Sequence, residues 1–171
     1  MNSRRTLLAA VVALAAALRL SGIGWDGWHH QHPDARVRVM VAARLAQPHS
    51  LGEALDPART PANPNNRGHQ FYVYGVLPPQ VTAAVATLVG ARSYGGLLAV
   101  GRVLAVLVDL VALALRIARA ARLGGDTAAL LAGALYATCA LPIQQSRFGT
   151  CDVWGVAAVL GYGRGFCVGR G

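Results

Sequence analysis

The chain has 171 residues, of which 54% are hydrophobic and only 13% are charged, and its mean hydropathy is +0.42. Globular domains carry about 25% charged residues, so this composition excludes an ordinary soluble domain and indicates an integral membrane protein. The net charge of +9 comes from arginine, because the chain contains no lysine. Such a basic balance fits cytoplasmic anchoring or contact with anionic headgroups and lipid-linked phosphate, and no nucleic-acid partner is expected.

The first predicted span covers about residues 5–23, and its apolar run, from Thr6 to about Ile23, is interrupted only by Arg19. Its length is close to the minimum for crossing a bilayer, about 18 residues. A signal peptide has a similar pattern, but the apolar segments downstream favour a retained first helix. Arg4 and Arg5 precede the run and predict a cytoplasmic N-terminus, so the residues after the run emerge on the outer face.

The most polar stretch, WDGWHHQHPDAR, follows this run and holds two of the seven acidic residues. Imidazole and carboxylate are suitable ligands for zinc or manganese, so His29, His30 and His32 with Asp34 form a candidate metal site. Their spacing matches no established motif, however, and solvated histidines at the membrane interface are the simpler interpretation. Asp26 lies closer to the end of the first helix, and we expect it to be structural.

Residues 34–47 are predicted to form an amphipathic helix on the membrane surface. Its apolar face comprises Val37, Met40, Val41 and Leu45. Asp34 stands at the start of this helix. It can therefore be the N-cap, where aspartate is favoured, or a catalytic group, and the two roles can coexist.

Residues 71–90 approach the hydrophobicity of a span, but Pro78 and Pro79 predict a shallow or broken helix. If this segment crosses the bilayer, Asp34 and Asp152 lie on opposite sides. The arginines that end the next span would then face outside, against the positive-inside rule. If the segment lies on the outer surface, or dips in and returns, both carboxylates share one face. We predict this second topology.

Three apolar runs predict spanning helices, at about 97–123, 126–146 and, as the start of another, 152–160. The second should close at Pro142, which would leave residues 144–152 as a short polar connection. Residues 161–171 carry glycine at every second or third position. They are predicted to be an irregular tail, from truncation or a frame shift, with a flexible tail as the alternative.

Arg102 and Asp109 lie within the 97–123 span, seven residues apart on one helical face. Charges inside a membrane are costly and usually face a bundle interior or a cavity. We expect Asp109 to pair with a neighbouring helix, and Arg102, nearer the outer face, to reach a ligand. Without additional helices, both charges should face lipid, and stability should be weak. A transporter would need internal repeats, and the sequence contains none.

The order of these motifs resembles one known family. The first helix is followed by WD and HPD, the amphipathic helix, NNRG with YVYG, the GR…D span, and LPIQQS…F…T…D. This order resembles the N-terminal part of bacterial GT-C membrane glycosyltransferases of the protein-mannosyltransferase and aminoarabinose-transferase type, glycosyltransferase family 39. The resemblance covers about residues 1–160 and implies an all-α, polytopic GT-C-like fold.

The resemblance implies a lipid-linked donor, a polyprenyl-phosphate sugar, at the outer face of the membrane. A hexose or pentose would pass to an acceptor hydroxyl with inversion. The essential aspartate of the family corresponds to Asp34. A second acidic residue, near a divalent metal or the donor phosphate, corresponds to Asp152. Arg67, Arg102 and Arg147 are candidates for binding phosphate, which arginine grips with paired N–H groups.

The sequence departs from the family at two positions. The acidic pair that usually follows His-Pro is Asp34-Ala35 here, and Arg147 occupies a position often held by histidine. Both departures count against a metal at Asp34 and Asp152. The expected protein resides in a bacterial inner membrane, with membrane lipids and an unidentified acceptor as its other partners. Because family members have more helices, we expect this chain alone to be inactive. The alternative is a small, non-catalytic integral membrane protein or scaffold.

Overall fold

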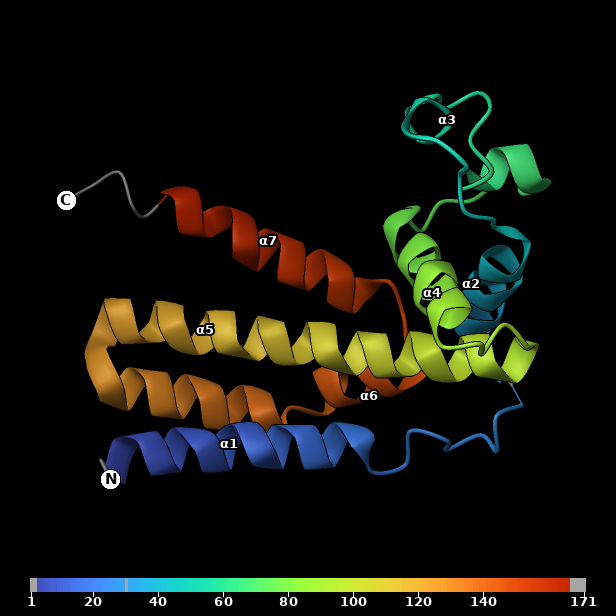
Figure 1. Ribbon diagram of the computed structural model, residues 1–171. Helices are drawn as coiled ribbons and strands as arrows, with labels where there is room; N and C mark the ends of the chain where they lie inside the picture. The colour runs from blue at the N-terminus through green and yellow to red at the C-terminus, as the bar shows by residue number, and fades with distance from the viewer. Residues whose placement is uncertain (1–2, 30, 167–171) are drawn as a thin grey trace. The chain divides into compact units, whose positions relative to one another are not determined.

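The computed structural model describes residues 3–29 and 31–166, and all regular elements in that part of the chain are helices (Figure 1). The all-α class predicted from the sequence is therefore confirmed. The chain divides into two units, Gly24–Leu104 and Met1–Ile23 with Ala105–Gly171. Below they are called the loop unit and the hairpin unit.

The loop unit contains four short helices and the start of a long one. They are α2 (Pro33–Arg44), α3 (Leu51–Leu55), η1 (Pro64–Arg67), α4 (Leu77–Leu88) and the first residues of α5 (Tyr94–Thr138). Helix α2 packs against α4 (Figure 1). Their shared core is made of small and branched apolar side chains from α2, α4 and α5: Ala35, Val39, Val41, Ala42, Leu45, Ala83, Ala86, Leu97 and Leu98.

The buried face of α2 differs from the predicted one. Val41 and Leu45 are buried as expected, but Val37 and Met40 are 39% and 44% exposed. The buried stripe includes Arg38, only 1% exposed, at the position that continues the i, i+3, i+4, i+7 spacing of a packed helix face. The arginine fits because Gly101 has no side chain. A Cβ at residue 101 would lie 2.7 Å from an Arg38 guanidinium nitrogen.

Helix α2 begins at Pro33, one residue before the predicted start at residue 34. Its N-cap is His32, and Pro33 is the first helical residue. Proline suits that position because its φ is already helical and no hydrogen bond is lost. Asp34 is therefore not the N-cap but a first-turn residue, where its negative charge complements the helix dipole.

Helix α4 has 12 residues and begins with Pro78 and Pro79 in its first turn. At 1.5 Å per residue its length is about 18 Å, well short of the ~30 Å hydrocarbon core. Prolines are tolerated there because first-turn N–H groups have no intrahelical partner. By itself α4 is too short to cross a bilayer. The predicted topology, in which Asp34 and Asp152 share one face, requires that this segment does not cross.

The hairpin unit contains α1 (Ser3–Leu20), most of α5, α6 (Ala140–Phe148) and α7 (Asp152–Phe166). Helix α5 reverses direction at Gly124 and Gly125, so that it consists of two limbs, 94–123 and 126–138 (Figure 1). Gly125 has φ 70° and ψ −160°, a conformation essentially restricted to glycine. Residues from α1 and from both limbs form the core of this unit, with Ala15, Leu113 and Ala137 fully buried.

The predicted 126–146 span is wrong in its second half. Helix α5 ends at Thr138, and α6 begins at Ala140. The cause is Pro142, whose ring would clash with the carbonyl four residues earlier, at Thr138, in a continuous helix. Residues 144–148, expected in a polar connection, belong to α6, which ends at Gly149 in the left-handed conformation.

The predicted irregular tail is also partly wrong, because α7 continues to Phe166. Each glycine costs a helix about 1 kcal/mol relative to alanine, which weakens α7 without forbidding it. The remainder of the predicted tail, 167–171, lies outside the described residues.

Within the described residues, α5 is the helix that is long and apolar enough to cross a membrane. Helix α1 has the length but contains three arginines in its 18 residues, and α7 has only 15 residues. The structure therefore shows an all-helical protein with one candidate span. The polytopic architecture expected from the sequence is taken up under the proposed function.

Candidate functional site

Asp34 is placed in the first turn of α2 with its carboxylate half-exposed. Its Oδ1 accepts a hydrogen bond from the Tyr74 hydroxyl at 3.0 Å. The Tyr74 ring lies 5.8 Å from the Tyr72 ring, centroid to centroid. Asp34 forms no ion pair with any described residue. One carboxylate oxygen is thus fixed by a neutral donor, and the other accepts no hydrogen bond from the described chain.

The segment that leads to Asp34 is fastened by Asp26. The two carboxylate oxygens of Asp26 accept hydrogen bonds from the two Nη atoms of Arg102, both at 2.8 Å. They also accept hydrogen bonds from the backbone N–H groups of Trp28, at 3.1 Å, and Gln31, at 3.2 Å. The hydrogen bonds from Arg102, the largest cause, hold the pKa of the Asp26 carboxyl far below its usual range. Asp26 is therefore a buried anion that organises the turn.

The Arg102 guanidinium is also held by aromatic rings. Its central carbon lies 5.8 Å from the Trp25 ring centroid and 5.5 Å from that of Trp28, distances typical of cation–π contacts. Trp28 has φ +67°, which costs a non-glycine residue about 1–2 kcal/mol. The ring contact and the hydrogen bond from Trp28 to Asp26 offset this strain. Trp25 and Trp28 therefore help to hold the Arg102 guanidinium in place.

Arg102 was predicted to bind a donor phosphate, and its charge is already paired. The side chain is fully buried, and its two Nη atoms are bound to Asp26. A buried arginine that is neutralised by a bidentate carboxylate would have to give up that partner to bind a phosphate. The observed geometry favours a positioning role, in which Arg102 holds Asp26 and thereby the segment that precedes Asp34.

Arg67 is not beside Asp34. Its Nε donates a hydrogen bond to the Arg44 carbonyl at 2.7 Å, so it caps the C-terminal end of α2. Asp34 lies at the opposite end of the same helix, ten residues away, or about 15 Å along its axis. Arg67 is exposed. A phosphate bound by Arg67 would therefore lie too far from Asp34 for the two residues to act on the same sugar linkage.

The two remaining candidates belong to the hairpin unit. Arg147 donates hydrogen bonds from Nη2 to the Leu18 carbonyl at 2.5 Å and to Ser21 Oγ at 3.0 Å, so it caps the end of α1. Asp152 is the exposed first residue of α7, where a carboxylate interacts favourably with the helix dipole. Asp34 belongs to the other unit, so a joint site with Asp152 stays a prediction.

The expectation that Arg102 and Asp109 would face lipid is wrong. Both are buried, and each has a partner within the chain. Arg19 donates from Nε to Asp109 Oδ2, and Tyr136 donates to Oδ1 at 2.6 Å. Arg19 also donates to the carbonyls of Ala15 and Ala137. The pairing predicted for Asp109 is therefore observed. Its partner is Arg19, the charged residue that interrupts the first apolar run.

No group of three metal-ligating side chains occurs within residues 3–29 and 31–166. His29 is exposed, His32 is the N-cap of α2, and His30 lies outside the described residues. The metal suggested for Asp34 and Asp152 would need a third ligand beyond those two carboxylates. Metal binding at this pair stays a prediction.

Two residues of the site were missed or undervalued in the sequence. Tyr74 is 40 residues from Asp34, and no local pattern links them. Asp26 precedes Gly27, and an Asp-Gly pair is a strong turn signal. That signal could have predicted the turn, whose His29 N–H donates to the Asp26 carbonyl at 3.2 Å. It could not have predicted Arg102 as the partner.

Comparison with known proteins identifies no family or relative for this chain. No protein-family model, curated protein or solved structure matches this chain.

Proposed function

We propose that this chain is part of a polytopic membrane glycosyltransferase of the GT-C type, which uses a polyprenyl-phosphate sugar as donor and Asp34 as catalytic base. The observation that carries the proposal is the environment of Asp34. Among the described residues, four of the seven acidic side chains are ion-paired: Asp26, Asp56, Asp109 and Asp126. Glu53 is used in capping α3. Asp34 and Asp152 remain, and Asp34 is the half-buried one.

The chemistry suits a carboxylate held in this way. In an inverting transfer, the acceptor oxygen attacks the anomeric carbon, the bond from that carbon to the phosphate oxygen breaks, and polyprenyl phosphate leaves. The acceptor proton passes to a base on the acceptor side. The hydrogen bond from Tyr74 fixes Oδ1 of Asp34 and leaves Oδ2 to take that proton. Asp26 and Arg102 support this arrangement by fastening the backbone at Trp28 and Gln31, just before Asp34.

A polytopic membrane architecture is the second part of the proposal. It is supported by the candidate span in α5 and by ion pairs that neutralise Arg19 and Arg102 inside the helical packing, as polar groups within a bilayer require. In this arrangement the N-terminus is cytoplasmic and the Trp25–Asp34 segment faces outward. The arginines that precede the reversal of α5, Arg116, Arg119 and Arg122, are then cytoplasmic, in agreement with the positive-inside rule.

Photo-crosslinking to a donor analogue tests the proposed activity. The full chain in phosphatidylcholine vesicles is exposed to a polyprenyl phosphate that carries a benzophenone, and to the corresponding uncharged polyprenol. We expect the phosphate probe to label the chain more strongly and its adducts to map to peptides containing Asp34 or Tyr74. Equal labelling by both probes would reject a lipid-phosphate donor and favour the non-catalytic membrane protein.

Two substitutions and one control substitution separate phosphate binding from catalysis. Arg147→Gln should reduce labelling by the phosphate probe if Arg147 contacts the donor, whereas Arg59→Gln should not. Arg59 is the matched control because its side chain is 85% exposed and its ion pair is superficial. Asp34→Asn should leave labelling unchanged while it abolishes release of sugar from a radiolabelled polyprenyl-phosphate hexose by a complete enzyme of this type. Undiminished release in that variant would remove Asp34 from the catalytic role.

A further inference from the structure

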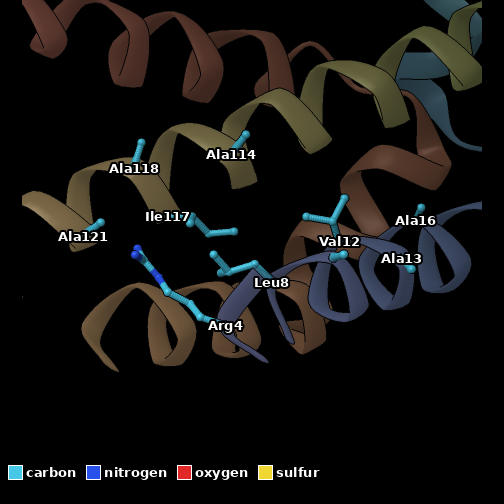
Figure 2. A pocket seen from close by; sticks show the side chains of 10 residues that line it. Arg4, Leu8, Val12, Ala13, Ala16, Ala114, Ile117, Ala118 and Ala121 are labelled. Atoms are coloured by element: carbon cyan, nitrogen blue, oxygen red, sulfur yellow. The ribbon is translucent and has the colours of Figure 1, made fainter. Parts of the chain in front are cut away.

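A second feature of the hairpin unit has the character of a ligand site. A groove of about 650 Å³ lies between α1 and the first limb of α5 (Figure 2). Nine of its ten lining residues are apolar, and six of these are alanines. Leu8 and Val12 from α1 and Ile117 from α5 supply the larger side chains. Because alanines are short, the facing helix surfaces do not fill the space between them.

The tenth lining residue is Arg4, which reaches into the gap between the helices at the Ala121 end (Figure 2). One of its terminal nitrogens, Nη2, lies 2.6 Å from Asp126 Oδ1. Its Nε is buried and has no hydrogen-bond partner among the described residues. A buried donor without an acceptor is unfavourable. The Arg4 side chain as a whole is 41% exposed, so an anionic ligand at this end of the groove can approach its guanidinium group.

The Arg4 end of the groove carries an excess of positive charge. Arg5 follows Arg4 on α1, and Arg122 follows the lining residue Ala121 on α5; both are exposed. The carboxylate that the structure places at this end is Asp126, which is bound to Arg4. This end of the two helices therefore carries three arginines and one acidic residue.

We propose that this groove binds one acyl chain of an anionic phospholipid and that the arginines at its Arg4 end bind the phosphate. The apolar length of the groove accommodates the chain, and the guanidinium groups complement the headgroup, because arginine binds phosphate through paired N–H donors. In the proposed topology this end lies in the cytoplasmic leaflet, where anionic lipids attract basic clusters. The inference depends on insertion in a membrane but not on the transferase activity.

Lipid selectivity tests the site directly. The full chain is reconstituted in phosphatidylcholine vesicles with spin-labelled phosphatidylglycerol or spin-labelled phosphatidylcholine, and the fraction of motionally restricted lipid is compared. One basic residue near a headgroup contributes about fivefold in affinity. We therefore expect severalfold selectivity for phosphatidylglycerol and a loss of about fivefold in Arg4→Gln. Equal restriction of both lipids would overturn the proposal.

Two further variants exclude a merely structural explanation. Asp126→Asn removes the carboxylate that competes for Arg4, so selectivity for phosphatidylglycerol should rise, whereas damage to the fold would lower it. Ala118→Leu fills the groove and should abolish selectivity. Its matched control is Ala10→Leu, at an exposed α1 position that does not line the groove. Selectivity that survives Ala118→Leu would overturn the proposal.

The same variants distinguish other occupants. If a helix of a second copy fills the groove, Ala118→Leu should reduce chemical cross-linking between copies and leave lipid selectivity unchanged, a result against the lipid site. Failure of this proposal is also separable from failure of the transferase proposal. Donor adducts near Asp34 should be unaffected by Ala118→Leu, and lipid selectivity should be unaffected by Asp34→Asn.

Discussion

Asp26 and Arg102 form a bidentate ion pair in which both carboxylate oxygens accept hydrogen bonds at 2.8 Å and both side chains are buried. The pair joins the turn after α1 to the first limb of α5. The same carboxylate accepts two backbone N–H groups of the turn. One acidic residue therefore holds the turn in shape and ties it to α5, and its loss would leave Arg102 buried without a counter-ion.

Replacing Asp26 should destabilise the protein severely. Removing one partner of a buried ion pair costs about 3–5 kcal/mol, because the remaining charge is uncompensated. We expect Asp26→Ala to lower the free energy of unfolding by that amount. The measurement is unfolding by sodium dodecyl sulfate, followed by circular dichroism. The matched control is Asp56→Ala, whose pair with Arg59 is exposed and should contribute at most about 1 kcal/mol. Equal effects of both substitutions would contradict the structure.

The contribution of Asp26 should depend on pH at the acid end only. Its pKa is lower in the folded state than in the unfolded state, where it is about 3.9. The stabilisation is therefore fully present above about pH 4 and is lost as the pH falls through the folded-state pKa. The difference in melting temperature between the natural chain and Asp26→Asn should be constant from about pH 5 upward and shrink toward pH 2. A difference that grew on acidification would have the wrong sign.

The Arg19–Asp109 pair should behave as a unit in a double-mutant cycle. Arg19→Leu or Asp109→Leu alone leaves one buried charge and should cost about 3–5 kcal/mol. The double variant should cost far less than the sum, because no unpaired charge remains. The cycle is measured by detergent unfolding of the four proteins. Additive losses would show that the two side chains do not interact in the folded protein.

Gly125 should resist replacement. Its φ of 70° and ψ of −160° are strained for a residue with a Cβ, by about 1–3 kcal/mol. Gly125→Ala should therefore destabilise the helical hairpin by this amount in the same unfolding assay. Gly155→Ala is the control. Gly155 lies within α7, and a Cβ there meets no atom within 4 Å. The control should be neutral or stabilising by up to about 1 kcal/mol.

Impermeant thiol labelling tests whether Asp34 and Asp152 share one face of the membrane. Cys151 lies next to Asp152, and replacing Cys139 and Cys167 by serine leaves it as a single reporter. A second variant lacks all three cysteines and carries Gln31→Cys. We expect both reporters to be labelled from the outside of intact cells, because α4 is too short to cross the bilayer. Labelling from opposite sides would exclude a site that contains both carboxylates.

Several features could be predicted from local sequence because their causes are local. The reversal of α5 falls between the two predicted spans, since Gly124-Gly125 permits a backbone conformation closed to other residues. The helix at Pro33 was expected because proline is favoured at the start of a helix. The break before Pro142 was misplaced by a few residues. A proline disrupts the helix on its N-terminal side, back to the carbonyl at Thr138.

The sequence by itself determined the helical class, the break at Gly124-Gly125 and the choice of Asp34 as a polar residue beside a helix start. Only the tertiary structure decided which charges are paired. Arg19 and Asp109 are 90 residues apart, and Asp26 and Arg102 are 76 apart. Charge pairing between such distant residues depends on which helix faces meet, and local periodicity carries no information about that. Once those pairs are assigned, Asp34 stands out because its partner is the neutral hydroxyl of Tyr74.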